Sequence, residues 1–367
     1  MVKANAYGHG ATICAQAAVR GGARWLGVTC VEEALEVRAV CPEAHIFLMS
    51  ATYPGQGEEV IRQRLTPVAW EQWQLDELES AARAAGLLPG TLPVHLEINT
   101  GMNRQGADEE DLPALLERFS PGSPLKLEGI ATHLYAADEA DGEVTSKQLR
   151  RLDHAMEIVN ATGLLPEWLN VGASAALLAG KGQNIVNLAN RHGLKAMIRP
   201  GLALYGVTPA FDPGFDPDHS LLEPDTLMDA RQELKPVLSW KTRVVSVRSV
   251  SEGAAVGYNG TFVATEPMRL ALLAVGYADG LDRMLGNHFC LLVRGQRALL
   301  AGRISMDQAM LDVTDIPGVE AGDEVVILGD QGDQSISAFD HADVTQTIPW
   351  EVFTRIGPRV RRVAVAE

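Results

Sequence analysis

The sequence predicts an α/β fold, a (β/α)8 barrel of the TIM type followed by a C-terminal all-β domain. Three observations lead to this prediction. Short apolar runs alternate with longer amphipathic segments over residues 1–200, a segment rich in proline and aspartate interrupts the alternation at 207–236, and strand-like runs dominate after it. Eight strand–helix units close a parallel barrel, so we expect the first part of the chain to form one.

Eight short apolar runs are the expected strands of the barrel. They lie at 2–5, 25–30, 46–50, 66–70, 94–99, 127–133, 168–173 and 195–199. Helix-like segments separate them, such as 31–40, where apolar residues recur at steps of three and four, and 71–85. Strands that alternate with helices in this way favour a parallel sheet.

The expected domains are the barrel at 1–215, a linker at 216–235 and a β domain at 236–367. Five prolines between 207 and 236 end the alternation of strands and helices. The segment after them carries few helical signals. Its expected strands are 237–250, 270–275, 289–293, 298–301, 309–313 and 324–328.

Composition narrows the class of protein. Lys and Arg number 31 against 47 Asp and Glu, and the net charge of -16 argues against nucleic acid and anionic membranes as partners. The four cysteines have no paired close spacing, so we expect reduced thiols. No apolar run approaches the roughly 18 residues of a membrane helix, and no signal peptide is visible. We therefore expect a cytoplasmic protein, with no metal site.

Polar residues stand where several of the predicted strands end. They are Lys3, Asn99, His133, Ser174 and Arg199. In a parallel barrel, catalytic residues gather at the carboxyl ends of the strands. These five side chains therefore predict an active site at that end of the barrel.

The segment Val-Lys-Ala-Asn-Ala-Tyr-Gly-His-Gly at 2–10 resembles the cofactor-lysine signature of alanine racemases, which use pyridoxal 5'-phosphate (PLP). The resemblance implies that Lys3 carries PLP covalently and that Tyr7 reaches its phosphate. A desolvated lysine of lowered pKa suits bond formation with a carbonyl. Composition alone also allows a solvated lysine at a surface strand end. Family members usually have some tens of residues before this strand, so we expect residues to precede Met1.

The segment 198–206, Ile-Arg-Pro-Gly-Leu-Ala-Leu-Tyr-Gly, resembles the Arg-x-Gly-x-x-x-Tyr-Gly motif of the family. The resemblance implies that Gly201 and Leu202 offer backbone N–H groups to the phosphate and that Ser174 adds a hydroxyl, although Ser174 also fits a helix N-cap. It also implies that Arg199 faces the pyridine nitrogen. Arginine keeps its proton, so the cofactor would be a weaker electron sink and a short-lived carbanion would favour racemisation. An arginine paired with a carboxylate at the barrel rim is the alternative.

Two further blocks of the barrel resemble the family. Residues 129–139 contain His133, which would lie against the cofactor and support Arg199, and Asp138, which fits either the substrate entrance or a solvated loop. Residues 95–106 contain Arg104, which would bind the substrate.

The β domain carries the other half of the resemblance. The blocks at 255–262, 273–280 and 301–308 imply that Tyr258 is a second catalytic base, that Tyr277 and Arg283 line the entrance, and that Met306 and Asp307 contact or shape the substrate site. A racemase must remove a proton from one face of Cα and return one to the other, which two positioned groups can do. In the family, lysine serves one face and a tyrosine of the partner subunit the other, so we expect a homodimer.

Several positions depart from the family. Glu97 stands where many members have a lysine, often carbamylated, and our hypothesis is that its negative charge orients Arg104. Asn170 stands where some members have a histidine, and Ala173 replaces a common asparagine. Trp350 stands at a phosphate-binding position that is often tyrosine, and its indole N–H can donate a hydrogen bond.

The function implied by the resemblance is that of a PLP-dependent alanine racemase, which interconverts L- and D-alanine and supplies D-alanine for peptidoglycan. A broad-specificity or serine racemase of the same fold is the alternative enzyme. A non-catalytic PLP-binding protein is the alternative of another class, and the β-domain blocks argue against it.

Overall fold

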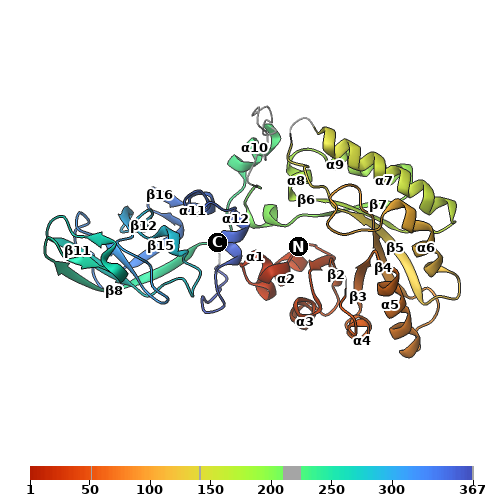
Figure 1. The fold of residues 1–367 in the computed structure, drawn as a ribbon, viewed down its shortest axis with the longest axis horizontal. Coiled ribbons are helices and arrows are strands. Elements are labelled where there is room, and N and C mark those ends of the chain that lie inside the picture. Colours follow the sequence, from red (N-terminus) through yellow and green to blue (C-terminus); the bar gives the residue numbers. More distant parts are fainter. Residues whose placement is uncertain (51, 140–141, 210–224, 366–367) are drawn as a thin grey trace. The chain divides into compact units, whose positions relative to one another are not determined.

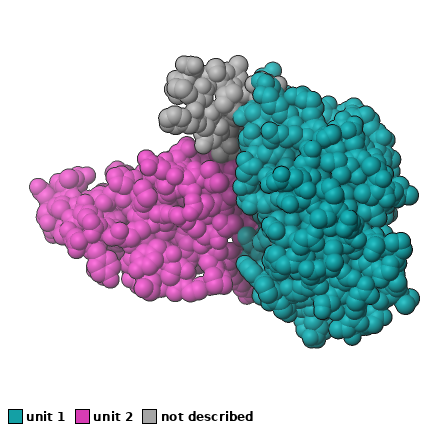
Figure 2. Space-filling model, turned by 45° about the vertical axis from the view of Figure 1, so that its right-hand side comes forward, with its two compact units in different colours: residues 1–6, 10–234 teal, residues 7–9, 235–367 magenta. Residues whose placement is uncertain are grey.

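The computed structural model describes residues 1–50, 52–139, 142–209 and 225–365. The chain divides into two compact units, one of residues 1–6 and 10–234 and one of residues 7–9 and 235–367 (Figure 2). Among the described residues, no helix is both long enough and apolar enough to cross a membrane. Each unit is built around its own sheet.

The first unit contains a parallel sheet of seven strands in the order β1 to β7 (Figure 1). Every neighbouring pair is parallel, as in the predicted barrel. The strands are β1 (Trp25–Val28), β2 (His45–Leu48), β3 (Leu65–Ala69), β4 (Leu92–Glu97), β5 (Leu125–Thr132), β6 (Trp168–Ala173) and β7 (Lys195–Arg199). Seven of the eight predicted barrel strands are thus confirmed, with ends shifted by at most two residues.

The predicted strand at 2–5 is wrong. Lys3–Tyr7 (α1) forms a single turn, in which the residues after Lys3 have left-handed φ values of 51° to 53°. One backbone group of this turn is bound locally, since the Ala6 N–H donates to the carbonyl of Val2 at 2.9 Å. The residues before the turn bind both edge strands of the sheet. The amino group of Met1 donates to the carbonyl of Pro200, directly after β7, and the N–H of Val2 donates to the carbonyl of Gly27 in β1, each at 2.9 Å.

Helices connect the strands of the first unit. The longer ones are α2 (Ala11–Arg20), α3 (Val31–Val40), α4 (Gly57–Arg62), α5 (Gln72–Ala84), α7 (Glu143–Ala161) and α9 (Gly182–Arg191). Shorter elements are η1 (Glu109–Asp111), α6 (Leu112–Leu116), η2 (Glu117–Phe119), α8 (Ser174–Leu178) and η3 (Leu202–Tyr205). The predicted helices at 31–40 and 71–85 are confirmed as α3 and α5. In α3 the buried residues Val31, Ala34 and Val37 recur every three positions, as the sequence pattern predicts.

The predicted linker at 216–235 coincides only in part with described structure. Residues 216–224 lie outside the described residues, and the remainder contains helix α10 (Asp225–Glu233). Sequence reasoning did not predict this helix. The division between the two compact units falls after Leu234.

The second unit is built on a seven-stranded antiparallel sheet in the order β13-β12-β15-β8-β11-β14, with β16 paired to β15. Its strands are β8 (Trp240–Val250), β11 (Met268–Leu273), β12 (Cys290–Val293), β13 (Gln296–Leu299), β14 (Ala309–Asp312), β15 (Glu324–Gln331) and β16 (Gln334–Ile336). A separate hairpin pairs β9 (Ala255–Val256) with β10 (Phe262–Val263). The all-β domain is confirmed, although two helices, α11 (Ala338–Thr345) and α12 (Pro349–Thr354), follow the sheet.

Candidate active site

Lys3 lies in a half-buried position among charged groups of the first unit. Desolvation lowers its pKa, and the positive charges of Arg104 and Arg199 lower it further, whereas Glu33 opposes the shift. A larger share of the amine is therefore unprotonated near neutral pH than for a solvated lysine. Such an amine can attack a carbonyl or accept a proton.

Arg199 ends β7 and is buried, with 8% of its surface exposed. Its Nη1 donates to the backbone oxygen of Asn170 at 2.8 Å and to the side-chain oxygen of the same residue. Its Nη2 donates to the carbonyl of Thr132 at 2.9 Å and lies 3.1 Å from Nδ1 of His133. Two neighbouring strands therefore fix the plane of the guanidinium, and these four partners are neutral groups.

His133 follows β5 and lies against Arg199. Burial and then the charges of Arg199, Arg104 and Lys3 lower its pKa to about 3. The ring is therefore neutral at physiological pH, and its Nδ1 accepts the hydrogen bond from Arg199. Its Nε2 then carries the proton, so the ring can donate a hydrogen bond on its other side.

Ser174 begins α8 directly after β6. Its Oγ accepts hydrogen bonds from the N–H groups of Gly201 at 2.9 Å and Ala203 at 3.2 Å. The alternative role as an N-cap is wrong, because Ala173 is the N-cap residue and no side chain caps this helix. Leu202 lies between the two donors at the start of η3. The serine hydroxyl thus binds the segment that the sequence predicts to hold a phosphate, and its own proton can still be donated.

Glu97 ends β4 and has 7% of its surface exposed. Its Oε2 accepts a hydrogen bond from Nε2 of Gln105 at 2.7 Å. Burial raises the pKa of Glu97, while the Gln105 hydrogen bond and the charges of Arg199 and Arg104 oppose this shift. Glu97 and Arg104 influence each other through charge. The hydrogen bond of Glu97 comes from Gln105, the residue after Arg104, and sequence reasoning did not predict this contact.

Asn99 organises the loop that carries Arg104. Its Oδ1 accepts from the N–H groups of Gly101 at 3.0 Å and Asn103 at 3.2 Å. Its Nδ2 donates to Asp108 Oδ1 at 2.8 Å. These contacts bind both ends of the loop, so Asn99 supports the position of the Arg104 backbone.

The remaining predicted residues belong to the second unit. Tyr258 begins η4 (Tyr258–Gly260) with 69% of its surface exposed, while Tyr277 is 44% and Met306 52% exposed. Asp307 accepts a hydrogen bond from Arg359 at 2.8 Å. Trp350 lies on α12.

Two of these segments are joined by backbone contacts. The N–H groups of Tyr277 and Ala278 donate to the carbonyls of Ser305 and Met306, each at 3.0 Å. A Cβ at Gly276 would lie 2.3 Å from the Met306 oxygen, so only glycine allows this approach. The structure thus brings the predicted entrance and substrate-binding blocks side by side.

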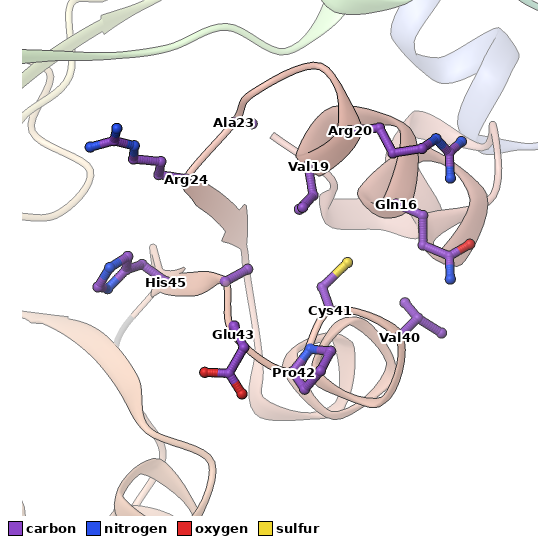
Figure 3. A pocket seen from close by; sticks show the side chains of 11 residues that line it. Gln16, Val19, Arg20, Ala23, Arg24, Val40, Cys41, Pro42, Glu43 and His45 are labelled. Carbon is purple, nitrogen blue, oxygen red and sulfur yellow. The ribbon is translucent and has the colours of Figure 1, made fainter.

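A cavity of about 470 Å³ lies elsewhere on the first unit, between α2, α3 and the start of β2. None of the predicted site residues lines it. Figure 3 shows Val19 and Cys41 pointing into it, whereas Arg20 and Arg24 point outward. We therefore locate the candidate active site at the strand ends and not in this cavity.

Comparison with known proteins assigns both parts of the chain to one family. The chain matches the family "Alanine racemase, N-terminal domain" over residues 1–209 and the family "Alanine racemase, C-terminal domain" over residues 237–364. It is 38% identical to the alanine racemase of Sorangium cellulosum (strain So ce56), with 99% of this chain and 90% of that protein covered.

Solved structures give the same result. The alanine racemase from Streptomyces coelicolor A3(2) has a TM-score of 0.84 and 34% identity, with 100% of this chain and 91% of that chain covered. An alanine racemase from a D-cycloserine-producing Streptomyces lavendulae has a TM-score of 0.85 and 33% identity, with 100% and 90% covered.

The parallel barrel, the antiparallel second unit and these relatives define an amino-acid racemase, which is an isomerase. Within that class, the chain belongs to the alanine racemase family.

Proposed function

We propose that this protein is a PLP-dependent enzyme that interconverts L- and D-alanine and so supplies D-alanine for peptidoglycan in the cytoplasm. The observation that carries the proposal is the half-buried Lys3, whose pKa desolvation lowers beside Arg104 and Arg199. This is the position that matches the family's cofactor lysine.

The residues of the first unit fit PLP. Ser174 binds the N–H groups of Gly201 and Ala203, so a hydroxyl and a turn of backbone amides meet where a phosphate would be held. The fixed guanidinium of Arg199 presents a donor suited to a ring nitrogen. Tyr7, Leu202 and Trp350 complete the proposed cofactor contacts. When bound, PLP withdraws electrons from the Cα of the amino acid and so makes its proton removable.

Lys3 and Tyr258 are the proposed bases on the two faces of Cα. The lowered pKa of Lys3 makes its Nζ a proton acceptor near neutral pH. Tyr258 is 69% exposed in the isolated chain, so its hydroxyl is available to a partner subunit. The proposal therefore includes a homodimer in which each site receives Tyr258 from the partner.

Arg104, Met306, Tyr277 and Asp307 are the proposed substrate contacts. An arginine guanidinium matches the geometry of a carboxylate with two parallel hydrogen bonds. Tyr277 and Met306 share the backbone contacts described above, so they form one rigid edge of the entrance. This edge would limit the size of the side chain that can enter.

The test is racemisation of alanine, serine, lysine and glutamate by purified protein supplied with PLP. We expect alanine to react fastest and Lys3→Ala to abolish both racemisation and the absorbance band of lysine-bound PLP. Activity mainly on a large side chain would replace alanine by a broader substrate class. A lysine-bound PLP band without racemisation of any of the four amino acids would favour the non-catalytic alternative.

A further inference from the structure

Glu33 binds backbone N–H groups of two separate segments, the turn at Lys3–Tyr7 and the residue after β1. Its Oε1 accepts the N–H of Ala4, the residue directly after Lys3, at 2.6 Å. Its Oε2 accepts the N–H of Thr29, directly after β1, at 2.7 Å. Both are short hydrogen bonds to a carboxylate, the kind that is stronger than a bond between neutral groups.

The backbone that Glu33 binds is one that needs support. Ala4, Asn5, Ala6 and Tyr7 all have φ values near +52°, where side chains other than glycine are disfavoured. Asn5 contributes further contacts, since its side chain accepts the N–H of Ala11 at 2.7 Å and its carbonyl the N–H of Gly10 at 2.9 Å. Glu33 is the contact next to Lys3 itself, and it ties the turn to the end of a core strand.

The charge of Glu33 also reaches the lysine. Lys3 is influenced by the positive charges of Arg104 and Arg199, and it in turn influences His133. Glu33 is the negative charge that opposes the two arginines. Helix α3 thus supplies one carboxylate that both holds the lysine backbone and balances the charge around its amine.

We infer that Glu33 is a positioning residue for Lys3, fixing the turn that carries the lysine and placing a negative charge beside its ammonium. This inference rests on the proposed function of Lys3 as the residue that binds PLP. Sequence reasoning did not single out Glu33, because one glutamate in an amphipathic helix gives no signal of the backbone it faces. A displacement of the lysine by about 1 Å would lower turnover about 100-fold.

The test compares Glu33→Gln with Glu36→Gln, a control on the same helix. Glu36 is exposed, so Glu36→Gln removes the same charge from α3 without disturbing the turn at Lys3–Tyr7. The first measurement is amide hydrogen exchange at Ala4, which needs no cofactor. We expect exchange at Ala4 to be at least about tenfold faster in Glu33→Gln than in Glu36→Gln, because a charged acceptor is lost.

The second measurement uses the protein loaded with PLP. In Glu33→Gln we expect kcat to fall about 10- to 100-fold with little change in KM. We also expect the pH midpoint of the absorbance of lysine-bound PLP to move down, because the negative charge of Glu33 no longer opposes the positive charges of Arg104 and Arg199. Equal Ala4 exchange in the two variants, or an unchanged midpoint in Glu33→Gln, would overturn the inference. If the unsubstituted protein forms no lysine-bound PLP, the proposed function fails, while the exchange measurement still decides whether Glu33 holds the turn.

Discussion

Replacing Asn170 by alanine tests how the guanidinium of Arg199 is held. The Oδ1 of Asn170 accepts from Nη1 of Arg199, while its Nδ2 is buried and has no hydrogen-bond partner among the described residues. Asn170 itself is fully buried, with none of its surface exposed. The substitution therefore removes one useful hydrogen bond and one unsatisfied donor together.

The two effects on stability have opposite signs. Loss of a hydrogen bond to a charged group destabilises by about 1.5–3 kcal/mol, and removal of an unpaired buried amide stabilises by about 1–3 kcal/mol. The free energy of unfolding should therefore change by less than about 2 kcal/mol. Arg199 keeps its contacts with the Asn170 and Thr132 carbonyls but can tilt, so we expect kcat to fall about 10- to 100-fold.

Urea unfolding and racemisation kinetics on Asn170→Ala give the two quantities. The matched control is Asn160→Ala, which removes an exposed asparagine that contacts His192 on the barrel exterior. We expect the control to keep full turnover. The reasoning would be refuted if the free energy of unfolding of Asn170→Ala fell by more than about 3 kcal/mol while turnover per folded molecule stayed normal. That result would show that Asn170 serves in packing and does not hold the guanidinium of Arg199.

Three further predictions follow from single contacts. The pKa of His133 is lowered to about 3, so its contribution to stability is present above the unfolded pKa of about 6.5 and is lost as pH falls toward 3. In urea unfolding, the wild type should therefore lose about 2 kcal/mol more of its free energy of unfolding than His133→Gln when the pH is lowered from 7 to 5. Equal losses in the two proteins would contradict the lowered pKa. Burial raises the pKa of Glu97, so the cost of the ionised carboxylate to stability grows as pH rises above about 4.3. Glu97→Gln should remove this pH dependence and raise the KM for alanine. Unchanged KM and turnover in this variant would rule out a role for the charge of Glu97 near Arg104. Gly276→Ala places a Cβ 2.3 Å from the Met306 carbonyl oxygen. Thermal unfolding should therefore show that the free energy of unfolding falls by about 1–3 kcal/mol. An unchanged Tm would mean that the segments around Gly276 and Met306 separate easily.

The periodicity of the sequence predicts most of the fold because both sheets have ordinary strand patterns. Buried strands such as β3, where all five residues are buried, appear in the sequence as short and mostly apolar runs. Helix α11 was missed, although a signal was present: Ser337 and Asp340 form a reciprocal capping box at its start. The four residues 337–340 could have revealed that helix without any knowledge of the tertiary structure.

The turn at Lys3–Tyr7 could not be predicted in the same way. Its apolar and small residues read as a strand, and its left-handed backbone depends on Glu33, which lies 29 positions further along the chain from Ala4. Gln105 was missed for a similar reason, since its partner Glu97 is on a strand and the contact depends on the fold of the loop between them. Periodicity describes which face of an element is buried, but it does not describe which distant carboxylate receives a backbone N–H.

The residues that hold Arg199 show the same distinction. Arg199 was expected to receive support from His133, and the 3.1 Å contact agrees with that expectation. Two further hydrogen bonds go to the carbonyls of Asn170 and Thr132, which any residue type could supply at those positions. Substituting either side chain would leave these carbonyl contacts in place. The backbone of β5 and β6 therefore sets the direction of the guanidinium, and the side chains at 133 and 170 set only its final tilt and its electrostatic surroundings.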